Sequence, residues 1–105
     1  MDSKSDILFR IKKSVKATDP DAIVILYGSF ARGDDHKGSD IDLIILLNKD
    51  KISRDDEKRI KYPLYDIEFE SGQIISPMVI SKNNWDTLYR ITPLYENVTS
   101  EGIEL

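Results

Sequence analysis

The chain has 105 residues, a formal net charge of −4, 40% hydrophobic and 32% charged residues, and no cysteine. These values fit one globular domain over residues 1–105, and the acidic charge disfavours a large nucleic-acid interface. The lack of cysteine excludes disulfides and thiolate metal sites, and the lack of a long apolar run excludes a membrane span and favours a cytoplasmic protein.

The first half of the chain predicts a helix followed by two buried strands. Residues 5–17 place four apolar side chains on one helical face, with Ser5 as the N-cap: Ile7, Leu8, Ile11 and Val15. Residues 22–27 (AIVILY) and 40–47 (DIDLIILL) read as short buried strands. Between them, residues 29–32 predict a single helical turn and residues 34–39 a polar loop.

The middle of the chain predicts a polar helix and a hairpin. Ser53 caps a helix that we expect to end near Tyr62, before Pro63, and to lie on the surface. Residues 64–70 (LYDIEFE) alternate between apolar and acidic side chains, as a half-buried strand does. Ser71-Gly72 then predicts a hairpin turn into a strand over residues 73–80, where Pro77 favours an edge position.

The last quarter of the chain predicts two short helices. Ser81 caps the first, which carries Trp85 and Tyr89 as core residues, and Thr92-Pro93 begins the second, which ends at Gly102. Because helices and strands are mixed along the chain, the expected class is α/β or α+β, a small mixed sheet flanked by helices.

Two acidic residues open the second buried strand. Asp40 and Asp42 are two residues apart, so both side chains leave the same face of the strand. At a separation of about 5 Å and an effective dielectric of about 20, their repulsion is roughly 3 kcal/mol. A divalent cation relieves this repulsion, and Mg²⁺ accepts one or two carboxylates together with substrate phosphates. A solvated pair of loop acids is the alternative interpretation of these two residues.

A Gly-Ser pair follows the first buried strand. Gly28 allows the backbone to approach a ligand closely, and the Ser29 hydroxyl and the amides after it can donate to phosphate oxygens. Arg32 offers a permanently charged guanidinium to the same phosphates. An ordinary strand-to-helix turn would explain the glycine alone, so the pair gains meaning only together with the acids. A Walker A loop and an EF-hand loop are both absent.

The combined pattern resembles a known signature. Gly-Ser-Phe-Ala-Arg-Gly at residues 28–33, followed by Ser-Asp-Ile-Asp-Leu at residues 39–43, is similar to the signature of the polymerase-beta-like nucleotidyltransferases, and the short length resembles their minimal group. The resemblance implies the nucleotidyltransferase fold and transfer of a nucleoside monophosphate, usually AMP, from a nucleoside triphosphate such as ATP. It implies that Gly28, Ser29 and Arg32 bind the triphosphate. Asp40 and Asp42 would hold Mg²⁺ in a two-metal site, with Mn²⁺ as an alternative ion.

Members of this family usually carry a third carboxylate on a neighbouring strand. The candidates are Asp66, Glu68 and Glu70. If the strand over residues 73–80 runs parallel to residues 40–47, Glu70 lies near the acid pair, and we favour it as the third catalytic residue. If residues 64–70 are the parallel neighbour, Asp66 is better placed. A third interpretation is that all three acids simply face solvent.

The acceptor of the nucleotide is not indicated by the residues themselves. Minimal nucleotidyltransferases often pair with HEPN-domain proteins, many of them ribonuclease toxins, so the resemblance suggests an antitoxin that adenylylates or masks such a toxin. The second hypothesis is a non-catalytic module that keeps the fold and binds a nucleotide or the toxin. A homo-oligomer stays open in either case, and no membrane partner is expected.

Overall fold

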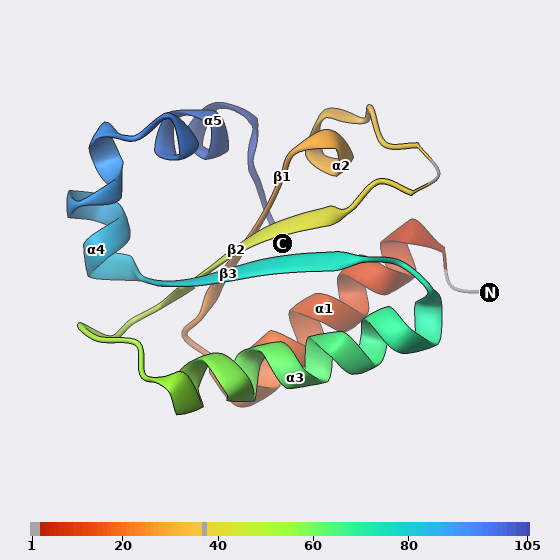
Figure 1. The fold of residues 1–105 in the computed structure, drawn as a ribbon, viewed down its shortest axis with the longest axis horizontal. Coiled ribbons are helices and arrows are strands. Elements are labelled where there is room, and N and C mark those ends of the chain that lie inside the picture. Colours follow the sequence, from red (N-terminus) through yellow and green to blue (C-terminus); the bar gives the residue numbers. More distant parts are fainter. Residues whose placement is uncertain (1–2, 37) are drawn as a thin grey trace.

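A four-stranded mixed sheet forms the centre of the computed structural model, which describes residues 3–36 and 38–105 (Figure 1). The strand order is β3-β2-β1-β4, with β1 antiparallel to both β2 and β4, and β2 parallel to β3. The bounds are Ile23–Tyr27 for β1, Ile41–Leu47 for β2, Ile75–Ser81 for β3 and Ile103–Glu104 for β4. The expected small mixed sheet is therefore confirmed, and Pro77 does lie on an edge strand.

Two long helices cover one face of the sheet (Figure 1). Helix α1 (Lys4–Thr18) buries Ile7, Ile11 and Val15, as its apolar spacing predicts. Its N-cap is Ser3, which exchanges hydrogen bonds with Asp6 in a capping box, so the predicted cap at Ser5 is wrong. These side chains pack against residues of β1 and β2 that point to the same face: Val24, Leu26, Leu43 and Ile45.

Helix α3 (Arg54–Ser71) corrects the prediction for the middle of the chain. The helix does not end before Pro63 but continues through it, and residues 64–70 are helical rather than a strand. The reason is that Ile60, Leu64 and Ile67 recur at the helical spacing and are buried against the sheet. Ser71-Gly72 is not a hairpin turn, because Gly72 has a φ of 74° and caps the helix, its N–H donating to the Glu68 carbonyl.

Shorter helices cover the opposite face of the sheet (Figure 1). They are α4 (Lys82–Thr87), the 3₁₀ turn η1 (Tyr89–Ile91) and α5 (Pro93–Glu101), with the predicted caps at Ser81 and Thr92. Trp85 is buried, and its ring centroid lies 5.0 Å from that of Tyr95 and 5.7 Å from that of Tyr89. No helix in the described ranges is long and apolar enough to cross a membrane.

The alternation of side chains along β2 decides which face carries the acid pair. Ile44 and Leu46 belong to the core under α4 and α5, whereas Leu43 and Ile45 belong to the core under α1 and α3. Asp42 has the same parity as Ile44, so its side chain leaves the sheet on the α4–α5 side. The helical turn α2 (Ser29–Arg32) follows β1 beside this end of β2 (Figure 1).

Candidate active site

Gly28 brings the turn after β1 into direct contact with the second acid of β2. Its φ is 76°, a backbone conformation that favours glycine, and its carbonyl accepts hydrogen bonds from the amides of Ala31 and Arg32 at 3.1 Å. A Cβ atom at Gly28 would lie only 2.5 Å from Oδ2 of Asp42. The two halves of the pattern, which are more than ten residues apart in the sequence, therefore meet in space.

Asp40 and Asp42 lie at the mouth of β2 between two strands. Asp42 is half-buried and stands opposite Tyr27 on β1 and Ser76 on β3. The Ser76 hydroxyl donates to Oδ2 of Asp40 at 3.4 Å. Neighbouring strands therefore place a tyrosine and a serine beside the acid pair, and Tyr27 is a neighbour that the sequence pattern did not single out.

The charge of the acid pair is not fully compensated by the protein. Burial, and then the charge of Asp40, raise the pKa of the Asp42 carboxyl above its ordinary value of 3.8, while the Arg32 guanidinium acts in the opposite direction. Burial, and then the charge of Asp42, likewise raise the pKa of the Tyr27 hydroxyl. An arrangement that holds two carboxylates together against their repulsion provides the oxygen donors that a hard divalent cation prefers.

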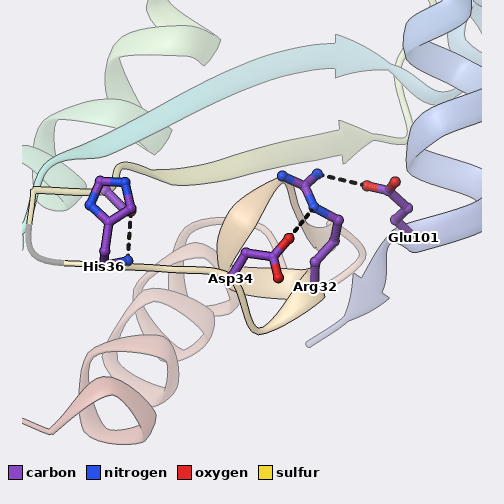
Figure 2. Close-up of polar contacts among 5 residues, drawn as sticks. Arg32, Asp34, His36 and Glu101 are labelled. Atoms are coloured by element: carbon purple, nitrogen blue, oxygen red, sulfur yellow. Dashed lines mark hydrogen bonds and ion pairs between the residues drawn. The ribbon is translucent and has the colours of Figure 1, made fainter.

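Arg32 is held between two carboxylates at the rim of the site (Figure 2). Its Nε donates to Oδ2 of Asp34 and its Nη1 donates to Oε2 of Glu101, both at 3.0 Å. These hydrogen bonds, first that of Asp34 and then that of Glu101, raise the pKa of the guanidinium. Glu101 lies at the end of α5, 69 residues away in the chain, and no local sequence signal connects it to Arg32.

The structure does not bring Glu70 or Asp66 to the acid pair. Both belong to α3, which covers the other face of the sheet; Glu70 accepts a hydrogen bond from Nη2 of Arg10 at 2.8 Å. Asp66 lines a cleft of about 430 Å³ between α1 and α3. β3 does run parallel to β2, but the segment before it is a helix, so the geometry that favoured Glu70 is not formed. Over residues 3–36 and 38–105, no three metal-ligating side chains of His, Cys, Asp or Glu cluster together.

Two comparisons with known proteins agree with this geometry. The nucleotidyltransferase domain family matches residues 8–91, which include the turn, the acid pair and all of β3. A protein of Methanocaldococcus jannaschii named "putative protein adenylyltransferase" is 32% identical over 80 residues, which cover 73% of this chain and 79% of that protein. The chain therefore belongs to the nucleotidyltransferase family, as a minimal domain of enzymes that transfer a nucleoside monophosphate from a nucleoside triphosphate to an acceptor.

Proposed function

We propose that this enzyme uses Mg²⁺ to transfer AMP from ATP to a side chain of a partner protein. The observation that carries the proposal is the close approach of Gly28 to Asp42, where a Cβ would meet Oδ2 at 2.5 Å. A turn that can bind phosphates and a pair of carboxylates that can hold a cation thus share one small space. Adenylylation of a protein is also the activity in the name of the M. jannaschii relative.

Each residue of the site has a role in the proposal that follows from its position. The amides of Ser29 and Phe30 at the start of α2 and the Ser29 hydroxyl bind the triphosphate, because donors at a turn that opens a helix point toward an anion. Arg32 orients the phosphates from the rim. Asp40 and Asp42 would hold Mg²⁺, which when bound neutralises phosphate charge and activates the acceptor. Most of the rate enhancement then comes from positioning and charge compensation.

The acceptor in this proposal is a HEPN-type toxin, with the present chain as its antitoxin. The relative's name supports a protein acceptor in general. The choice of a HEPN-type toxin rests on the resemblance of the site pattern to minimal nucleotidyltransferases. The acid pair opens at one end of the sheet beside α2, and Asp40 is exposed there. A side chain of a second protein can therefore approach the pair from solvent.

Ser76 favours a second candidate function, nucleotide binding without transfer. It stands opposite Asp42 on the parallel neighbour strand, the kind of position from which a third carboxylate would complete a metal site. A hydroxyl there is a weaker ligand than a carboxylate and cannot serve as a general base at neutral pH. In this second reading the chain binds the nucleotide and masks the toxin without modifying it.

Incubation with α-labelled ATP, Mg²⁺ and the product of the neighbouring gene tests both candidates. We expect label on the partner with the wild-type chain, none with Asp40→Ala or Asp42→Ala, and undiminished label with the matched control Asp66→Asn. ATP binding without label in any sample would support the binding module. Absence of ATP binding to the wild-type chain would overturn both candidates.

A further inference from the structure

Three aromatic side chains form an exposed stripe on α3. Tyr62, Tyr65 and Phe69 are 56%, 43% and 91% exposed, and the ring centroids of the two tyrosines lie 6.3 Å apart. Their spacing of three and four residues places them on one side of the helix, opposite the buried Ile60 and Leu64. None of the site's residues lies on this side of the sheet, so nucleotide chemistry does not explain this aromatic stripe.

The charges of α3 change sign across the aromatic stripe. After the acidic first turn of the helix, the turn directly before the stripe is basic, with Lys58, Arg59 and Lys61, and the turns after Tyr65 are acidic, with Asp66, Glu68 and Glu70. Acids near the C-terminal end of a helix oppose its macrodipole, and no basic residue lies in the last turn of α3. The intrinsic preference of the helix therefore does not account for the acidic turns after Tyr65.

Contacts within the chain pair only some of these charged side chains. Glu68 accepts a hydrogen bond from the Ile75 amide, and Glu70 pairs with Arg10. Among the described residues, no ion pair engages three of the remaining charges, Lys58, Arg59 and Asp66. The side chains of all three are exposed and free to meet a partner.

We infer that a second copy of this chain docks on α3, with the two helices antiparallel and the aromatic stripes in contact across a twofold axis. Such an axis sets the basic turn over residues 58–61 of one helix against the acidic turns over residues 66–70 of the other, on both sides of the stripe. A uniformly basic partner would meet like charge at residues 58–61, and a uniformly acidic partner would meet it at residues 66–70. The surface is thus complementary to itself, and this decides in favour of a second copy.

The proposed dimer leaves both active sites open. The acid pair faces the α4–α5 side of the sheet, whereas α3 covers the opposite side. The 18 residues of α3 extend about 27 Å at 1.5 Å per residue, so a contact between two such helices is at the small end of specific interfaces. We therefore expect a reversible dimer that dissociates on dilution.

Sedimentation equilibrium over a dilution series tests the aromatic part of the contact. The wild-type chain should show a monomer–dimer equilibrium, and Phe69→Ser should weaken it at least tenfold. The matched control is Ile91→Ser, because Ile91 is 92% exposed, as Phe69 is 91%, but lies in η1 on the other side of the sheet. A wild-type chain that stays monomeric at every concentration, or equal losses in both variants, would overturn the proposal.

Charge exchange tests the antiparallel arrangement. The variant Lys58→Glu/Arg59→Glu and the variant Asp66→Lys/Glu70→Lys should each be monomeric alone, since each sets like charges together across the axis. Mixed in equal amounts, they should form a heterodimer, which also shows that both variants fold. Failure of the mixture to associate, while each variant retains its wild-type circular dichroism spectrum, would contradict the proposed pairing. Association of either variant alone would contradict it as well.

Discussion

Gly28 meets two separate requirements at one position. Its positive φ of 76° disfavours any L side chain, and the space in which a Cβ would stand is taken by the Asp42 carboxylate. Gly33 meets only the first requirement, because its φ is 78° but no atom lies within 4 Å of its Cβ position. A comparison of the two glycines therefore distinguishes the cost of a side chain at positive φ from the cost of a clash with the Asp42 carboxylate.

This difference gives a matched pair of substitutions. Gly33→Ala should lower the free energy of unfolding by about 1 kcal/mol, the ordinary penalty for a side chain at positive φ. Gly28→Ala should lower it by a further 1–2 kcal/mol or so and should also abolish ATP binding, because Asp42 must move. Chemical denaturation and titration calorimetry measure both effects. Equal losses of stability and of binding in the two variants would contradict the close approach of Gly28 and Asp42.

The proposed metal-binding role of Asp42 opposes stability. The pKa of Asp42 is raised by burial and by Asp40, so the folded chain binds this proton more tightly than the unfolded chain does. The contribution of Asp42 to stability therefore falls as the pH rises from the ordinary pKa of 3.8 through the raised value. Asp42→Asn should therefore raise the midpoint of thermal unfolding at neutral pH, because it removes the buried charge and its repulsion from Asp40, while it abolishes transfer. A less stable Asn variant in thermal denaturation would show that the carboxylate is compensated.

At the level of elements, α5 takes part in the site through one hydrogen bond. Gly102 lets the chain turn tightly after α5, since a Cβ there would meet the Val98 carbonyl and would lie 2.8 Å from Cγ2 of Ile25. The turn leads into β4, which pairs with β1, and it holds Glu101 over α2. The C-terminal segment thereby fixes the direction of the Arg32 side chain.

Glu101→Gln tests this positioning role. If Arg32 orients phosphate, loss of the ion pair should raise KM for ATP severalfold and leave kcat nearly unchanged, because the acid pair is intact. Glu101→Asp should restore part of the lost affinity. A parallel fall of kcat, or a drop in stability with unchanged KM, would mean that Glu101 acts only on the fold.

In helix α3, local patterns favour a strand where tertiary packing forms a helix. Residues 64–70 satisfy the two-residue period of a strand, but the apolar spacing that begins at Ile60 continues into them at the helical period. Pro63 lacks an amide donor and is usually taken as a break, yet burial of Leu64 and Ile67 against the sheet outweighs that cost here. Because these preferences compete within a few residues, only tertiary packing decides between them.

The start of α3 provides a pH-dependent test at the same scale. The Asp56 carboxylate accepts hydrogen bonds from the Lys49 ammonium at 2.6 Å and from the Ser53 backbone amide at 3.0 Å. The Lys49 contact is the largest cause that lowers the pKa of Asp56 to about 2. Its contribution to stability is therefore present above pH 3.8 and is lost as the pH falls toward 2. Denaturation of Asp56→Asn should be less dependent on pH across this window. An unchanged dependence would contradict the role of Asp56.

At the scale of the whole molecule, the sequence predicts the strands and the turn that carry Gly28, Asp40 and Asp42 better than it predicts the segment between β2 and β3. Strands β1 and β2, the α2 turn and the edge position of β3 follow from local apolar runs, Gly28 and Pro77. The position of Glu70 depended instead on whether one segment was helix or strand. The Arg32–Glu101 contact joins residues 69 positions apart. Contacts of this kind arise from the packing of elements, so short-range patterns do not reveal them.

In the proposed function, the Gly28-Ser29 turn and the Asp40–Asp42 pair form one nucleotide site. Paramagnetic broadening of amide signals by Mn²⁺ with a non-hydrolysable ATP analogue measures this most directly, because the effect falls steeply with distance from the ion. The signals of residues 28–29 and 40–42 should broaden most, and those of residues 66–70 on α3 should stay sharp. If the amide signals of Asp66 and Glu70 broadened most, the ion would lie in the cleft between α1 and α3, and a shared nucleotide site would be contradicted. Broadening that spares residues 28–29 and 40–42 would contradict it as well.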